Sequence, residues 1–215
     1  MGKKACIVTG GLLDECFLRE HIQNNSYDIW IVVDGALELT HRLRLLPDYI
    51  VGDFDTVDQS LLEFYDSDRI LRHPPEKDQT DTELAIETAM EYRCKEIVLL
   101  GATGSRLDHS LANIFLLERL LEQGIHAVIQ DASNRLYVKK DSFCIDREQA
   151  FGNYFSLLPL TEKVEHVTLT GFKYPVQDMT FYRKYTLGVS NEITGEKAAV
   201  EFSEGIFVVV ESRDK

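Results

Sequence analysis

Two carboxylates follow a short apolar run in residues 50–56, which read IVGDFDT. In an extended segment, residues i and i+2 point to the same side, so Asp53 and Asp55 can converge on one point. At a separation of ~4 Å, two carboxylates repel by about 1 kcal/mol in water. A Mg²⁺ ion reverses the sign of that interaction, because it prefers hard oxygen ligands. The alternative is a pair of turn-forming residues after a strand, and this segment alone leaves both interpretations open.

A second polar segment reads EKDQTDTE and combines a cation with several carboxylates. Thr80 followed by Glu83 is a capping-box pattern, which predicts that a helix begins there. Asp81 in the first turn interacts favourably with the helix dipole. Capping does not explain Lys77 and Asp78 just upstream. A helix N-terminus with a nearby lysine suits phosphate oxygens, and Asp78 and Asp81 could hold a metal or a polar substrate group.

The third polar segment, GATGSRLDHS, joins an apolar run to a helical pattern. Gly101 and Gly104 would let the backbone approach a phosphate closely, and Arg106 offers a bidentate fork. Asp108 and His109 follow in the first helical turn. The segment is neither a Walker A loop nor the dinucleotide G-x-G-x-x-G motif. A histidine at this place is also compatible with a purely structural role.

The elements that must position these residues alternate along the first 130 residues. The β-branched runs ACIVTGG, DIWIVVDGA, DYIVGDFD, EIVLLGA and HAVIQDA mostly end in Gly or Asp. Helical patterns lie between them, most clearly at 80–93 and 107–123. Such alternation predicts an α/β fold class, with a mainly parallel sheet covered on both faces in a three-layer domain. Ligands of open parallel sheets bind at the carboxyl ends of the strands, where Asp34 and Gly35 also fall.

The polar segments therefore meet at one predicted edge of the sheet. In helix 107–123 we expect Leu111, Ile114 and Phe115 to face the core. A surplus of carboxylates with two cations is what Mg²⁺-assisted phosphoryl transfer from a nucleotide requires. The residues gathered at this edge are Asp53, Asp55, Asp78, Asp81, Asp108, Lys77 and Arg106.

The second half of the chain loses the helical period. Its short runs RLYVKK, SFCID, YFSLLPL, EHVTLTG, KAAVEF and GIFVVVES are separated by polar turns. This pattern predicts a small antiparallel sandwich or barrel, of which we choose the β-sandwich. We place the boundary near residues 132–140, which gives an α/β domain at 1–134 and a β-sandwich domain at 135–215.

Composition limits the partners and the location. The formal net charge of −13 argues against a general binder of nucleic acid or of anionic membranes. The four cysteines form no C-x-x-C pair, so we expect reduced thiols. The N-terminal run is interpreted as a first strand and not as a signal peptide, and no stretch approaches the ~18 apolar residues of a membrane span. These features predict a cytoplasmic protein.

The motifs DGA, GDFDT, KDQTDTELAI and GATGSRLDHSLANI, in this order, resemble those of the thiamine pyrophosphokinase (thiamine diphosphokinase) family. In the second half, SLLPLT, LTGFKYP, GVSNE and GIFVVVES resemble that family's thiamine-binding β-domain. The resemblance covers nearly the whole chain. It implies a Mg²⁺-dependent homodimer that transfers the pyrophosphoryl group of ATP to the hydroxyl of thiamine, giving thiamine diphosphate and AMP.

Carried over residue by residue, the resemblance implies four groups of site residues. The metal ligands would be Asp53, Asp55 and Asp78. The catalytic residues would be Asp53, Asp55, Asp81, Arg106 and Asp108, of which Asp108 could orient or deprotonate the attacking hydroxyl. The nucleotide would contact Asp34, Gly35, Lys77, Gly104, Arg106 and His109. Thiamine would contact Asp78, Asp81, Ser190 and Asn191. Thr56 and Ala36 depart from the family's usual residues without removing a charged group.

Two other functions fit part of the pattern. Asp53 and Asp55 also match the D-x-D-x-[T/V] motif of haloacid-dehalogenase-type phosphatases, in which Asp53 would become the phosphorylated nucleophile. Against this, the motif follows the third strand and not the first, and no Asp-Asp pair occurs downstream. A non-catalytic regulator that binds a nucleotide or thiamine is the other alternative, although a binder needs fewer carboxylates.

Overall fold

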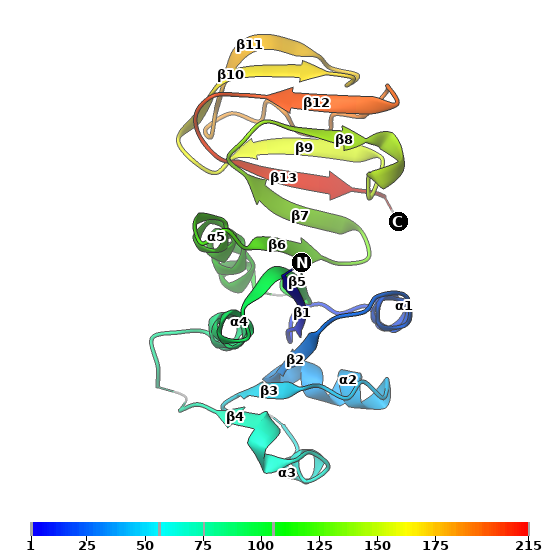
Figure 1. The fold of residues 1–215 in the computed structure, drawn as a ribbon, viewed down its shortest axis with the longest axis vertical. Helices are drawn as coiled ribbons and strands as arrows, with labels where there is room; N and C mark the ends of the chain where they lie inside the picture. Colours follow the sequence, from blue (N-terminus) through cyan, green and yellow to red (C-terminus); the bar gives the residue numbers. More distant parts are fainter. Residues whose placement is uncertain (1, 56, 75, 105, 215) are drawn as a thin grey trace. The chain divides into compact units, whose positions relative to one another are not determined.

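A computed structural model of the chain describes residues 2–55, 57–74, 76–104 and 106–214, so Thr56 lies outside the described residues. The chain divides into two compact units, Met1–Ala132 and Ser133–Lys215. The first unit alternates strands and helices and the second consists mainly of strands (Figure 1). Within the described ranges, no helix has the length and apolar character needed to cross a membrane.

Among the described residues, the first unit has parallel strands in the spatial order β4-β3-β2-β1-β5-β6. Successive strands are added outward from β1 to β4, and β5 then pairs with the other side of β1. The order therefore reverses between β1 and β5, which is the switch point where open α/β sheets bind ligands. The strands are β1 Lys3–Val8, β2 Ile29–Val33, β3 Tyr49–Gly52, β4 Ile70–Arg72, β5 Cys94–Leu100 and β6 His126–Gln130.

Helices cover both faces of this parallel sheet, with α1 and α2 on one side and α4 and α5 on the other (Figure 1). The strands are apolar on both faces for that reason, and residues 5–8 of β1 have no exposed surface. Leu18 of α1 and Leu37 of α2 pack into a core cluster with alternate strand residues such as Val8 and Ile50. The helices are α1 Glu15–Asn24, α2 Leu37–Arg42, α3 Gln59–Leu62, α4 Asp81–Glu91 and α5 Leu107–Glu122.

The predicted core face of α5 is wrong in part. Leu111 and Phe115 are 52% and 57% exposed, and the buried residues of the helix are Asn113, Leu117 and Leu120. The helix has more than one apolar stripe, because residues 107, 111 and 115 recur every four positions beside the stripe that packs. Spacing alone does not tell which of two apolar stripes meets the sheet.

The second unit consists of antiparallel strands in two sheets, which confirms the predicted fold class. One sheet has the order β11-β10-β12-β8, and the other part pairs β7, β13 and β9 in that order. The rings of Phe181 in β11 and Phe207 in β13 meet edge to face, with their centroids 5.6 Å apart. Aromatic rings from both sheets therefore contribute to the core of this unit. The strands are β7 Asn134–Lys139, β8 Phe143–Asp146, β9 Tyr154–Pro159, β10 Lys163–Thr170, β11 Val176–Tyr182, β12 Lys197–Glu201 and β13 Phe207–Ser212.

Candidate active site

A cavity of about 260 Å³ lies at the switch point of the parallel sheet. The ends of β1, β2 and β5 form its floor, and the first turns of α4 and α5 form two of its walls. Helix N-termini present unpaired backbone N–H groups and favour negative charge. A cavity between two of them is therefore suited to an anionic group such as phosphate.

Glycines allow the turns that form the floor of the cavity to approach one another closely. Gly11 donates its N–H to the carbonyl of Gly101 at 2.9 Å, which joins the turn after β1 to the turn after β5. A Cβ atom on Gly11 would lie 2.2 Å from that carbonyl oxygen, so no other residue fits there without a shift of the backbone. Gly101 and Gly104 have φ angles of 70° and 95°, a region that favours glycine.

Three carboxylates gather at one side of this cavity. Asp34, which lines the cavity, presents a ligand oxygen within 4.8 Å of those of Asp53 and Asp55. Gly52 permits the approach of β3 to Asp34, because a Cβ atom at position 52 would lie 2.8 Å from the Cβ of Asp34. Three hard oxygen donors at this spacing suit a Mg²⁺ ion, since carboxylates so close together repel one another.

Asp53 and Asp55 converge for a different reason from the one predicted. The segment is not extended at this point, because Phe54 has a φ of 60°, in the left-handed region. The Phe54 ring is buried, and the backbone turns so that Asp53 Oδ1 accepts the N–H of Asp55 at 3.2 Å. Arg72 donates to the carbonyl of Asp53 at 3.2 Å and stacks on the Phe54 ring, while Gln59 donates to the carbonyl of Phe54 at 2.9 Å.

The segment before α4 adds a partly buried ion pair. Lys77 Nζ lies 2.7 Å from Asp81 Oδ1, and the two side chains are 15% and 28% exposed. Thr80 accepts the N–H of Glu83 at 3.2 Å, which confirms the predicted helix cap. Thr80 and Asp81 line the cavity, whereas Asp78 is exposed and stands outside the group of three carboxylates.

The first turn of α5 is more exposed than the start of α4. Arg106 binds Asp108 through Nε at 3.1 Å and Nη2 at 2.5 Å. The Arg106 guanidinium, together with the N–H of His109, lowers the pKa of Asp108 to about 2. A carboxylate with so low a pKa is a weak base, so the arrangement suits orientation by Asp108 better than proton abstraction. Arg106 and His109 line the cavity.

The two predicted thiamine contacts in the second unit differ in their surroundings. Asn191 is buried, and its side chain bonds three backbone groups, the N–H and carbonyl of Tyr174 and the N–H of Glu192, at 2.9–3.0 Å. Ser190 is exposed, with a φ of 56°, and its N–H donates to Ser156 Oγ at 2.9 Å. The Asn191 side chain therefore shapes the turn that presents Ser190.

Some cavity residues have a role that the sequence did not indicate. Asn113 stands out in the sequence as a polar side chain on an otherwise apolar helix, but its role becomes clear only in the structure. It is buried and donates to the carbonyl of Ala102 at 2.8 Å, which fixes the turn after β5. The other missed residues carry hydroxyl groups next to glycine turns or helix starts: Thr9, Thr82, Thr103 and Ser110.

Fold and site together define an α/β protein with a cavity suited to anions and a carboxylate cluster at its switch point, followed by an antiparallel β unit. The chain is similar to known proteins along both units. The family description "Thiamin pyrophosphokinase, catalytic domain" matches residues 21–129, and "Thiamin pyrophosphokinase, vitamin B1 binding domain" matches residues 142–207.

Individual relatives agree with the family descriptions. Thiamine pyrophosphokinase from Bacillus subtilis (strain 168) is 30% identical over 198 residues, which is 88% of this chain and 90% of that protein. A crystal structure of thiamine pyrophosphokinase from Bacillus subtilis has a TM-score of 0.86 at 28% identity and covers 99% of this chain and 100% of that one. The structure from Geobacillus thermodenitrificans has a TM-score of 0.84 at 32% identity, with 99% and 98% covered.

The chain belongs to the thiamine pyrophosphokinase family, a family of kinase enzymes. The comparisons give no support to a haloacid-dehalogenase-type phosphatase or to a non-catalytic regulator.

Proposed function

We propose that this chain transfers the pyrophosphoryl group of ATP to the hydroxyl of thiamine, giving thiamine diphosphate and AMP. One observation supports this most directly. A cavity between two helix N-termini, suited to phosphate oxygens, includes Asp34 of the carboxylate cluster in its wall. In the reaction, the thiamine hydroxyl oxygen bonds to the β-phosphorus of ATP, and the bond from that phosphorus to the oxygen of AMP breaks.

The nucleotide side of the cavity follows from its donors. Gly35 and Gly104 offer backbone close to the ligand, and Arg106 offers a bidentate fork for phosphate oxygens. His109, on the same wall, is the remaining polar contact that we assign to the nucleotide. Lys77 is held beside the start of α4 by its ion pair with Asp81, where its charge can reach a phosphate group.

We assign the metal site to Asp53 and Asp55, together with Asp34. The donor set fits Mg²⁺, because all three ligands are carboxylate oxygens that lie within 4.8 Å of one another. When bound, the ion would neutralise charge on phosphate oxygens. Asp78, which the resemblance also assigns to the metal, is exposed just before α4, and we propose it as a carboxylate for the bound substrates.

The proton of the thiamine hydroxyl requires an acceptor. Asp81 lines the cavity and is the carboxylate that we propose for this role. Asp108 is less suited, because Arg106 lowers its pKa to about 2. We assign to Asp108 the orientation of Arg106, through the two hydrogen bonds between them.

We propose that residues 1–134 bind the nucleotide and residues 135–215 bind thiamine. Ser190 is exposed and presented by the buried Asn191, which supports a contact between this turn and the substrate. Carboxylates such as Asp78 suit the cationic thiazolium ring of thiamine. We further propose a homodimer in the cytoplasm, as the family resemblance implies. We also propose that it binds neither nucleic acid nor anionic membranes, which the net charge of −13 supports.

The test is to incubate the protein with Mg²⁺, ATP and thiamine and to detect AMP and thiamine diphosphate by mass spectrometry. We expect both products, and we expect Asp55→Asn to abolish turnover while the circular dichroism spectrum stays that of the wild type. The exposed Glu20→Gln, which removes one charge from α1, is the matched control and should retain activity. Free phosphate formed without thiamine would instead support the phosphatase, and ATP binding without AMP would support the regulator.

A further inference from the structure

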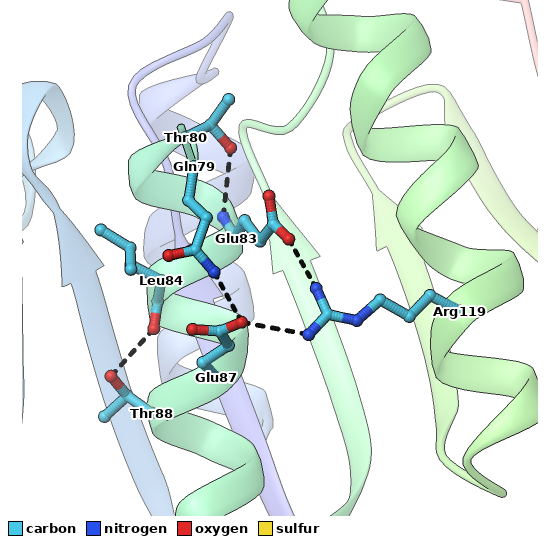
Figure 2. A network of polar contacts seen from close by, with 7 residues as sticks. All are labelled: Gln79, Thr80, Glu83, Leu84, Glu87, Thr88 and Arg119. Atoms are coloured by element: carbon cyan, nitrogen blue, oxygen red, sulfur yellow. Dashed lines mark hydrogen bonds and ion pairs between the residues drawn. The ribbon is translucent and has the colours of Figure 1, made fainter. Parts of the chain in front are cut away.

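Arg119 joins the two helices that wall the cavity, although it does not line the cavity itself. From α5, its guanidinium donates to Glu83 Oε1 at 2.5 Å and to Glu87 Oε1 at 3.0 Å, both on α4 (Figure 2). Glu83 and Glu87 are one helical turn apart and lie on the same face of α4. The planar fork of an arginine reaches both carboxylates at once, whereas a lysine offers a single point charge.

The same glutamates are connected to the segment just before α4. Glu87 Oε1 also accepts the side-chain N–H of Gln79 at 2.7 Å (Figure 2). Glu83 donates its backbone N–H to Thr80 Oγ1 at 3.2 Å, which fixes the helix cap. Arg119 and Gln79 thus share one carboxylate oxygen of Glu87. Through Gln79, this contact reaches Lys77 and Asp78, which precede Gln79 in the chain.

Arg119 has no direct contact with the cavity. It is absent from the residues that line the cavity, and it lies thirteen residues after Arg106, the N-cap residue of α5, which does line it. The effect of Arg119 on the cavity must therefore pass through α4. Since Arg119, Glu83 and Glu87 are 39%, 23% and 33% exposed, the network is held by partly screened ion pairs and contributes modestly to stability.

We propose that Arg119 is a positioning residue, which sets the first turn of α4 and the Lys77–Asp78 segment relative to the first turn of α5. Both walls of the cavity are then in place before the nucleotide binds, so that none of the binding free energy is needed to order the segment. This inference rests on the proposed function only in naming ATP as the ligand.

The test compares Arg119→Met, Gln79→Ala and the double variant in steady-state kinetics. We expect each single variant to raise KM for ATP by about 3- to 10-fold. The KM for thiamine should rise and kcat should fall as well, because Asp78 and Asp81 lie in the same segment. The double variant should be no worse than the more damaged single variant, because both changes interrupt one chain of contacts. Arg119→Lys should restore only part of the loss.

The matched control is Arg42→Met, which removes another arginine that joins two helices. Arg42 of α2 lies 2.9 Å from Glu15 of α1, on the other side of the sheet. This variant should lower the melting temperature no more than Arg119→Met does, because its single ion pair is more exposed, and it should leave KM for ATP unchanged. An unchanged KM for ATP in Arg119→Met, or effects of the two single variants that multiply in the double variant, would overturn the inference.

Failure of the proposed function would be seen separately, in the wild type. If the wild type forms no AMP with thiamine, the same variants are compared by calorimetric titration with ATP and Mg²⁺. The Kd values for ATP should then differ among the variants as the KM values for ATP are expected to differ. Equal affinity in the wild type and Arg119→Met, or no measurable affinity in the wild type, would contradict the positioning role.

Discussion

Replacing Asp53 by asparagine should stabilise the protein and inactivate it at the same time. Asp53 belongs to a group of three carboxylates whose ligand oxygens lie within 4.8 Å of one another. Asparagine keeps an oxygen that can accept the N–H of Asp55, so the hydrogen bond at 3.2 Å survives the change. Only the negative charge is lost. In the described part of the chain, the Asp53 carboxylate makes no ion pair that would be lost with it.

The magnitude follows from the geometry of the group. Two unit charges 4.8 Å apart repel by ~0.9 kcal/mol at the dielectric constant of water, and more in drier surroundings. Asp53 takes part in two of the three pairs, so its neutralisation relieves about 2 kcal/mol in dilute salt. For a chain of this size, each kcal/mol shifts the melting temperature by roughly 2–4 °C. Asp53→Asn should therefore melt about 4–8 °C above the wild type when no divalent cation is present.

Differential scanning calorimetry at low ionic strength with a chelator measures this shift. Millimolar Mg²⁺ should raise the melting temperature of the wild type and leave that of Asp53→Asn almost unchanged, because binding to the native state stabilises it. Glu20→Gln removes one exposed charge outside the group and should show neither effect. A melting temperature of Asp53→Asn at or below that of the wild type without Mg²⁺ would refute the repulsive cluster.

Two further changes probe the packing around the site and the core below it. Gly52→Ala would place a Cβ atom 2.8 Å from the Cβ of Asp34, so we expect the fold to be retained and the affinity for Mg²⁺ to fall by about 10-fold. Melting temperatures measured at increasing Mg²⁺ concentration give this affinity. An affinity equal to that of the wild type would mean that Asp34 is not a ligand. Burial lowers the pKa of His21 from 6.5 to about 4. The unfolded chain therefore binds the proton first, and stability is lost as the pH falls from about 6.5 to about 4, by up to ~3 kcal/mol. Urea denaturation at pH 7 and pH 5 should show a smaller difference in His21→Gln than in the wild type, and equal differences would contradict this origin.

The sequence predicted the elements and the edge of the sheet at which polar residues collect. Strand ends rich in Gly and Asp, and a Thr80–Glu83 cap that the structure confirms, are local signals that depend on few neighbours. The failures involve residues distant in sequence. The left-handed Phe54 is held by Arg72, which comes from the next strand, and the packed stripe of α5 is chosen by the sheet it meets. Periodicity contains neither kind of information.

Asp34 shows the same limit at the level of the site. In the sequence it follows its own strand and is separated from Asp53 by eighteen residues, so its place in the group of three carboxylates depends on the pairing of β2 with β3. That pairing brings Gly52 against Asp34, and only a residue without a side chain allows the approach.

Local rules are broken together at this one edge of the sheet. Three features of this edge each cost folding free energy. They are a bulky residue with a positive φ, a group of three converging carboxylates, and a glycine at the end of a strand. Burial of the Phe54 ring and the hydrogen bonds from Arg72 and Gln59 offset the backbone strain. The three carboxylates repel one another at this spacing, and a bound cation would turn that repulsion into attraction.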